Sequence, residues 1–340
     1  MKGLELSEQY YLAYGKDMLE TSFPGLLPLI AVGMAGPGSE CLGFDDDVSA
    51  DHDFGPGFTI FLPDESEVSR RAAFLLERAY MKLPEEFMGY RREKLSPAGG
   101  NRFGVVRRSD FFLASTGTAD GFLSDNEWLS LPEQSLLEAV NGKLFYDGDG
   151  VMSAIRSHLS SMPEDVRLKK LAGALYVMGQ AGSYNYKRIM LHNEAGSAVL
   201  SLAEFASEAL HAVYLINHAY MPYYKWSFRG ARGLGRFADD YSPADLASDL
   251  EAVLLDPSGA ESRIKTVEER TVEAVLSYLK DSGFSVMPGR STESSNPYRL
   301  RQGGEAFAES KDLGTLSMIV NNCVQDADLR NRSIFAGVNR

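Results

Sequence analysis

The chain has 340 residues, of which 44% are apolar and 24% are charged. This composition supports a folded chain with a packed core and argues against wholesale disorder. The 47 acidic residues outnumber the 34 basic residues, which gives a formal net charge of −13. A partner held mainly through DNA or RNA phosphates is therefore not expected, because such binding requires clustered positive charge. A local basic pocket is still compatible with this balance.

The two cysteines, Cys41 and Cys323, cannot form a disulfide framework. The simplest interpretation is that both are reduced thiols in a cytoplasmic protein, and a single bond between them is the alternative. The residues from Met1 to Leu19 mix charged and apolar side chains and lack the apolar core of a signal peptide. No stretch approaches the length of about 18 uncharged apolar residues that a membrane span needs, so no membrane partner is expected.

The first 150 residues or so combine short strand patterns with amphipathic helix patterns. Glycine and proline clusters separate these patterns, as at Pro24-Gly25 and Gly36-Pro37-Gly38. Ser130 and Pro132 resemble the start of a helix. The expected strands are 26–34, 51–62 and 102–108, with a short extended stretch over 144–147, and the expected helices are 6–20, 65–80 and 128–140.

From about residue 150 onward, long helical patterns dominate and runs of β-branched residues are few. Residues 288–304, rich in Ser, Asn, Gly and Arg, are expected to form a loop. We therefore expect an α+β domain with a short mixed sheet over residues 1–150 and an all-helical domain over 151–340. The expected helices of the second domain are 168–178, 197–217, 242–255 and 267–280.

Five aspartates occur within nine residues, just before the apolar residues 57–62. Residues i and i+2 of an extended segment point to the same face, so Asp51 and Asp53 are expected to do so. Two carboxylates on one face suit a hard divalent cation such as Mg²⁺. The alternative is a solvated acidic loop. The five are Asp45, Asp46, Asp47, Asp51 and Asp53.

Gly38 and Ser39 follow the expected strand 26–34, where backbone N–H groups and a hydroxyl suit a phosphate. A strand, a Gly-Ser pair, about a dozen residues and then Asp-x-Asp before another strand is similar to the signature of the nucleotidyltransferase superfamily. More closely, GFDDDVSADHDFGPGF followed much later by PYYKW resembles a bacterial family that carries the domain of unknown function 4037.

This resemblance implies a nucleotidyltransferase-like fold for the N-terminal domain. It implies that Gly38 and Ser39 bind the triphosphate of a nucleotide, with ATP as the expected donor, and that Asp51 and Asp53 ligate Mg²⁺ or Mn²⁺. The reaction would move a nucleoside monophosphate onto a hydroxyl of a small molecule or a protein, with pyrophosphate as the leaving group.

The resemblance has one departure. Members of the superfamily usually carry a third carboxylate on a following strand, and the expected strand 102–108 contains no acid. Asp110, just past this strand, is the nearest carboxylate and our candidate for the third catalytic acid. An acid from the helical domain is the alternative.

The helical domain contains two clusters of basic and aromatic residues. Lys225, next to Tyr223, is a point charge suited to a triphosphate, and a tyrosine ring can stack on a base or a sugar. Tyr184 and Arg188 form the second cluster. We expect these side chains to bind the nucleotide, with Lys225 and Arg188 facing the aspartates across an interdomain cleft. The alternative is an aromatic interface in which the two cations pair with acids.

The sequence thus predicts a cytoplasmic nucleotidyltransferase whose partners are a nucleotide and an unidentified acceptor. The missing strand carboxylate keeps open a second function, a nucleotide-binding regulatory protein without turnover. A purely structural interaction module is the third alternative, but it would make the Gly-Ser and Asp-x-Asp arrangement accidental.

Overall fold

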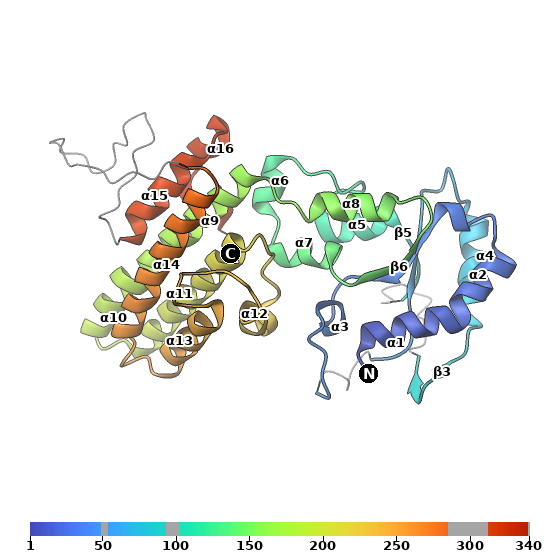
Figure 1. The fold of residues 1–340 in the computed structure, drawn as a ribbon, viewed down its shortest axis with the longest axis horizontal. Coiled ribbons are helices and arrows are strands. Elements are labelled where there is room, and N and C mark those ends of the chain that lie inside the picture. The colour runs from blue at the N-terminus through green and yellow to red at the C-terminus, as the bar shows by residue number, and fades with distance from the viewer. Residues whose placement is uncertain (49–53, 93–102, 285–311, 339–340) are drawn as a thin grey trace. The chain divides into compact units, whose positions relative to one another are not determined.

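The computed structural model describes residues 1–48, 54–92, 103–284 and 312–338 (Figure 1). The chain forms two compact units. The N-terminal unit comprises Met1–Leu123 and Glu133–Ser161, and the C-terminal unit comprises Ser124–Pro132 and Met162–Arg340. Because the two units interleave along the sequence, the chain passes from one to the other three times.

A four-stranded mixed sheet forms the centre of the N-terminal unit. Strand β1 runs antiparallel to both β2 and β6, whereas β2 and β5 are parallel. Gly33 pairs with Thr59, which in turn pairs with Gly104, so the C-terminal end of β1 lies beside the N-terminal ends of β2 and β5. The predicted short mixed sheet is confirmed. In the order β5-β2-β1-β6, the strands are Gly104–Arg107, Thr59–Leu62, Ala31–Met34 and Lys143–Asp147.

Helices cover both faces of this sheet. On one face, alternate residues of β1 and β2 pack against aromatic side chains of the N-terminal helix and of α4 (Arg70–Met81), including Tyr10, Tyr11 and Tyr80. On the other face, the ring of Phe61 lies 5.1 Å from that of Phe111 in α5 (Arg108–Thr116). The N-terminal helix consists of α1 (Gly3–Tyr10), the π-helical η1 (Tyr11–Gly15) and α2 (Lys16–Ser22).

Two more helices and a small hairpin complete the N-terminal unit. Helix α7 (Glu133–Val140) packs against both α5 and α8 (Val151–Leu159). The hairpin of β3 (Glu86–Phe87) and β4 (Tyr90–Arg91) lies apart from the main sheet. It brings the Tyr90 ring to 5.2 Å from that of Phe54, just ahead of β2.

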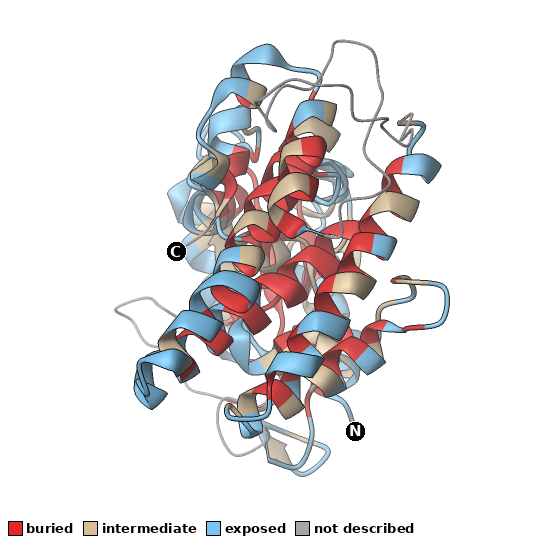
Figure 2. Ribbon diagram, turned by 90° about the vertical axis from the view of Figure 1, so that its left-hand side faces the viewer, coloured by how far each residue is buried: buried red, intermediate tan, exposed pale blue. Residues whose placement is uncertain are grey.

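The C-terminal unit is helical, as predicted, and the β pairing described there is an isolated bridge between Ala238 and Tyr241. Its longer helices are α9 (Glu164–Gly179), α11 (Ala195–Ile216), α13 (Pro243–Leu255), α14 (Glu261–Asp281) and α15 (Leu313–Cys323). Within the described ranges, α11 alone has the length and composition of a membrane span, but 72% of its apolar window is buried inside the protein. Figure 2 shows long runs of buried residues on the helices of this unit.

Shorter elements precede, separate or follow these helices along the chain. They are α6 (Asp125–Ser130), the π-helical η4 (Gln180–Tyr186), α10 (Lys187–Leu191), α12 (Tyr224–Ala231), α16 (Ala327–Asn331) and the 3₁₀ helix η5 (Ile334–Gly337).

Two prolines account for the clearest differences from the predicted elements. The expected strand 26–34 begins instead as a 3₁₀ turn, η2 (Leu27–Leu29), which contains Pro28, and only Ala31–Met34 is a strand. The expected helix 128–140 is divided into α6 and α7 at Leu131-Pro132, where Leu131 is extended (ψ 132°). Proline disfavours the helical conformation in the residue before it, and this restriction separates the two helices.

Other boundaries also differ. The expected helix 65–80 begins at Arg70, where the Ser69 hydroxyl accepts the N–H of Ala72 as an N-cap. Of the expected strand 51–62, Thr59–Leu62 form a strand and the described residues 54–58 do not. Asp51, Asp53 and all of the expected loop 288–304 lie outside the described residues.

Candidate functional site

The candidate site lies at one edge of the mixed sheet. Gly38 and Ser39 follow the C-terminal end of β1, and Phe54 precedes the N-terminal end of β2. Because β1 and β2 are antiparallel, these two ends share one edge. The sheet therefore places the Gly-Ser pair at the same edge as the N-terminal end of β2. Phe54, the residue after Asp53, precedes this end.

The loop after β1 has a backbone that requires glycine. Gly36 has φ 107° and Gly38 has φ 129° with ψ 145°, conformations that side chains with a Cβ rarely adopt. Ser39 then opens the single-turn helix α3 (Ser39–Leu42), which ends at Gly43 in the left-handed conformation. The Ser39 side chain is largely buried, and its hydroxyl lies 3.4 Å from the carboxylate of Glu40.

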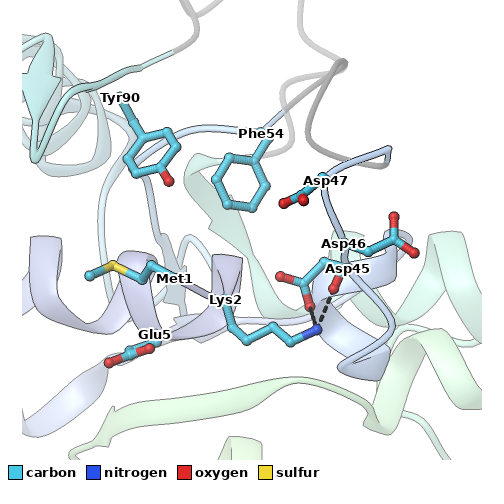
Figure 3. A pocket seen from close by; sticks show the side chains of 8 residues that line it. All are labelled: Met1, Lys2, Glu5, Asp45, Asp46, Asp47, Phe54 and Tyr90. Atoms are coloured by element: carbon cyan, nitrogen blue, oxygen red, sulfur yellow. Dashed lines mark hydrogen bonds and ion pairs between the residues drawn. The ribbon is translucent and has the colours of Figure 1, made fainter.

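A cavity of about 480 Å³ adjoins this edge. One side carries the Phe54 and Tyr90 rings, which meet edge to face, and Lys2 lies opposite them (Figure 3). Among the described lining residues, four side chains are carboxylates and one, that of Lys2, is an ammonium group, so these side chains favour positively charged ligands. The lining residues are Met1, Lys2, Glu5, Asp45, Asp46, Asp47, Phe54 and Tyr90.

Asp45 joins the N-terminal residues to the acidic segment. Its carboxylate accepts the backbone N–H of Gly3 at 2.8 Å and forms an ion pair with Lys2 Nζ at 3.4 Å. Lys2 also donates to the backbone carbonyl of Asp45. The side chain of Asp45 is 3% exposed, and its Oδ1 atom, which forms the ion pair with Lys2, accepts no hydrogen bond from the described residues. The ammonium group of Lys2 therefore balances the charge of this buried carboxylate.

Asp51 and Asp53, the predicted metal ligands, lie outside the described residues. Among the residues that the structure does describe, no three His, Cys, Asp or Glu side chains converge closely enough to hold a metal ion. That Asp51 and Asp53 hold a metal stays a prediction. The neighbouring carboxylates of the cavity offer the hard oxygen atoms that Mg²⁺ prefers.

The structure does not bring Asp110 to this edge. Because β5 is parallel to β2, its C-terminal end lies beside the C-terminal end of β2, at the opposite edge of the sheet. Asp110 follows that end in the first turn of α5 and is exposed. The preceding Ser109 donates to Asp64, which follows β2, with an O–O distance of 2.7 Å. Asp110 is therefore separated from Ser39 by the length of the strands.

Lys225 and Tyr223 lie at the start of α12 in the C-terminal unit. The rings of Tyr223 and Tyr224 are 4.2 Å apart, and both side chains are exposed. Lys225 Nζ lies 5.0 Å from the centre of the Trp226 ring, as does the guanidinium carbon of Arg229. Lys225 forms no ion pair with an acid of the described residues, so this surface is both aromatic and basic.

Tyr184 and Arg188 also contact each other, as their spacing of four residues allows on a helix. Arg188 donates to the Tyr184 hydroxyl at 2.6 Å, and its guanidinium carbon lies 4.8 Å from the centre of the Tyr184 ring. Tyr184 is 53% exposed. These residues belong to the C-terminal unit, whereas Gly38 and Ser39 belong to the N-terminal unit. That Lys225 and Arg188 face the aspartates stays a prediction.

Comparison with known protein families matches part of the chain. Residues 128–227 match the family described as a domain of unknown function, DUF4037. The match supports the resemblance to this family and includes both basic and aromatic clusters, but it begins after the Gly-Ser pair and the aspartates. No curated protein matches the chain.

Five contributors to the cavity were not predicted from the sequence, namely Met1, Lys2, Glu5, Phe54 and Tyr90. Met1 and Lys2 directly precede α1 and Glu5 lies in it, and the sequence pattern does not identify the packing partner of this helix. Phe54 directly follows Asp53 and could have been noticed as its neighbour. Tyr90 reaches the cavity through the β3–β4 hairpin, whose turn residues Met88 and Gly89 both have positive φ. Of these two residues, only the glycine is typical of such a turn in the sequence.

Proposed function

We propose that the protein is a Mg²⁺-dependent nucleotidyltransferase that moves a nucleoside monophosphate from a nucleoside triphosphate, with ATP as the expected donor, onto a hydroxyl group. One observation carries the proposal. The antiparallel pairing of β1 and β2 brings Gly38-Ser39 to the same edge of the sheet as the N-terminal end of β2, which Phe54 precedes. The order of β1, Gly-Ser, acidic segment, β2, α4 and β5 supports the nucleotidyltransferase-like fold that the sequence resembles.

In the proposed reaction, the oxygen of the acceptor hydroxyl attacks the α-phosphorus. A new O–P bond forms while the bond from the α-phosphorus to the bridging oxygen breaks, and pyrophosphate leaves. The acceptor proton passes to a base. Ser39 and the backbone N–H groups of its loop would bind phosphate oxygens, and Asp51 and Asp53 would hold the metal. A bound Mg²⁺ would offset the charge of the phosphate oxygens.

We place the acceptor in the cavity next to Phe54. Four carboxylates and one lysine line this cavity, so a positively charged acceptor fits it better than an anionic one. The Phe54 and Tyr90 rings provide an apolar wall for a sugar or another ring. The acceptor is thus a hydroxyl compound or side chain that also carries a positive charge.

A specific observation favours a second candidate function, a nucleotide-binding regulatory protein without turnover. Strand β5 contains no carboxylate, and Asp110 follows its far end. Without a third acid near the metal, binding would not lead to transfer. This protein would bind Mg²⁺–ATP and release no pyrophosphate.

Replacing the two predicted metal ligands tests the proposal. The full chain and its Asp51→Asn and Asp53→Asn variants are assayed for Mg²⁺-dependent binding of the four common nucleoside triphosphates and for pyrophosphate release with amine-bearing hydroxyl acceptors. We expect Mg²⁺-dependent nucleotide binding and the rate of pyrophosphate release to fall by about a hundredfold or more in each variant, because a neutral amide does not balance the charge of the cation. Asp64→Asn, at the opposite edge of the sheet, is the matched control and should retain wild-type values.

The outcomes separate the candidates. Pyrophosphate release by the wild type that both variants lose supports transfer. Binding without release across the acceptors supports the regulatory protein. A wild type that binds no nucleoside triphosphate, or variants that behave as the wild type, would reject the site.

A further inference from the structure

A side chain far away in the sequence holds the loop after β1. Asn141 Nδ2 donates to the backbone carbonyl of Gly36 at 2.9 Å, and Asn141 Oδ1 accepts the N–H of Gly36 at 3.0 Å. One amide side chain thus satisfies both backbone groups of Gly36, as a paired strand would. Asn141 is 105 residues from Gly36 and follows α7.

The next residue fixes the same loop from the turn between α7 and β6. The N–H of Gly142 donates to the carbonyl of Cys41, in α3, at 3.0 Å. Gly142 has φ 68°, and a Cβ there would lie 2.0 Å from the carbonyl oxygen of Met34 at the end of β1. The turn therefore contacts the segment from Met34 to Cys41 on both sides of the Gly-Ser pair.

Arg156 supports this turn from α8. Its Nη2 atom donates to the carbonyl of Val140 at 2.7 Å and also to the carbonyl of Asn141. Burial lowers the pKa of Arg156, and its Nε atom has no hydrogen-bond partner. Arg156 is half-buried, and its Nη2 atom donates to both carbonyl groups of the backbone that carries Asn141. Hydrogen bonds therefore connect Arg156 with Asn141, and Asn141 with Gly36, without interruption.

We propose that Asn141 and Arg156 are positioning residues for nucleotide binding. They fix the loop from Gly36 to Ser39 in one conformation before the nucleotide arrives, so that the Ser39 hydroxyl and the loop N–H groups meet the triphosphate without a further ordering step. This inference rests on the proposed function and identifies residues that serve the same site without touching the ligand.

The physical reason for such a device is the entropy of the loop. Two glycines with positive φ, Gly36 and Gly38, have wide conformational freedom when the loop is not held. Each backbone residue that must be ordered on binding lowers the affinity, and a loop ordered in advance avoids that cost. Removing the side chain of Asn141 should therefore weaken nucleotide binding more than it slows the chemical step.

The test uses full-length Asn141→Ala, Asn141→Asp, Arg156→Ala and Arg156→Lys variants. Tyr146→Phe is the matched control, because it removes one side-chain hydrogen bond to the backbone (Leu27 carbonyl, 3.0 Å) in the same sheet, away from the loop. Three quantities are measured: hydrogen exchange of residues 36–43 without nucleotide, the Kd for Mg²⁺–ATP, and pyrophosphate release against ATP concentration.

We expect Asn141→Ala to speed exchange of residues 36–43 and to raise the Kd or KM for ATP by about tenfold, with kcat within about twofold of the wild type. Asn141→Asp keeps the acceptor for the Gly36 N–H but loses the donor, so its effect should be intermediate. Arg156→Lys should recover part of what Arg156→Ala loses. Tyr146→Phe should match the wild type in all three measurements.

If the hydrogen-exchange rate of residues 36–43 is unchanged in Asn141→Ala, the inference is overturned, whatever the Kd for Mg²⁺–ATP. Faster exchange with unchanged ATP affinity overturns it as well, because the role of Asn141 is then structural only. A wild type that binds no nucleoside triphosphate rejects the proposed function, and the positioning role with it. A wild type that binds ATP, with an Asn141→Ala variant that binds it equally well, rejects the positioning role alone.

Discussion

Lys169 Nζ lies 2.6 Å from Asn321 Oδ1 in the interior of the C-terminal unit. It also donates to the carbonyls of Arg330 and Arg332, at 3.2 and 2.8 Å. The side chain is fully buried, and none of these three acceptors carries a charge. The ammonium group thus connects α9 with α15 and with the residues around α16, and no carboxylate of the described residues pairs with it. Burial lowers the pKa of Lys169 to about 8.

This buried lysine predicts a rise in stability with pH. Between pH 8 and about 10, the unfolded chain holds the Lys169 proton more tightly than the folded chain does, so the free energy of unfolding increases as pH rises through this window. The full effect is roughly 3 kcal/mol. Urea unfolding at pH 7, 8, 9 and 9.5 measures it.

Lys169→Met should flatten this dependence, because methionine has no proton to lose. Lys265→Met is the control, since Lys265 is exposed in α14 and should leave the wild-type slope in place. An equal slope in wild type and Lys169→Met would show that another group titrates in this window.

Two glycines with similar φ should respond differently to alanine. Gly142 has φ 68° and Gly117 has φ 78°, but a Cβ at Gly117 would meet nothing within 4 Å, whereas a Cβ at Gly142 would lie 2.0 Å from Met34 O. Gly117→Ala should lower the free energy of unfolding by about 1 kcal/mol from backbone strain alone. Gly142→Ala should lower it by about 3 kcal/mol or more, because β1 and β6 must also shift. Chemical denaturation measures both, and equal losses would contradict the steric argument.

Lys225→Ala should weaken the use of nucleotide and leave the fold intact. The side chain is exposed and forms no ion pair with an acid of the described residues, so its loss costs little stability. If the ammonium binds a phosphate, the KM for ATP should rise by about tenfold, and Lys225→Arg should recover part of it. Pyrophosphate release and thermal unfolding check the two parts. Lys265→Ala is the control, and a KM for Lys225→Ala equal to that of the wild type would remove Lys225 from the site.

The helices of the C-terminal unit could be predicted from sequence because each carries its own apolar periodicity. The expected helix 197–217 differs from α11 by two residues at the start and one at the end. The elements of the N-terminal unit were harder to bound, because its strands have four or five residues and the pattern alone does not show where pairing stops. Pro28 and Pro132 were visible in the sequence, and their effects on the preceding residues could have been anticipated.

Only the part of the site made of residues that are close in sequence could be predicted. Gly38 and Ser39 follow a strand, as expected, and lie at the edge where β2 begins. The direction of β5, which moves Asp110 to the far edge, depends on pairing with β2 and not on any residue of β5 itself. The contact between Asn141 and Gly36 could not be predicted from the sequence. It joins a side chain to backbone groups that every residue carries, so no residue pattern marks Gly36 as the partner.

The interleaving of the two units has a consequence for dividing the protein. Cleavage after Ser161 would leave α6, whose Trp128 is buried in the C-terminal unit, attached to the other fragment. Cleavage before Ser124 would separate Glu133–Ser161 from the rest of the N-terminal unit, and with it β6, Asn141 and Arg156. A single peptide-bond scission therefore yields no autonomous half, and either fragment should be prone to proteolysis until its complement is supplied in trans.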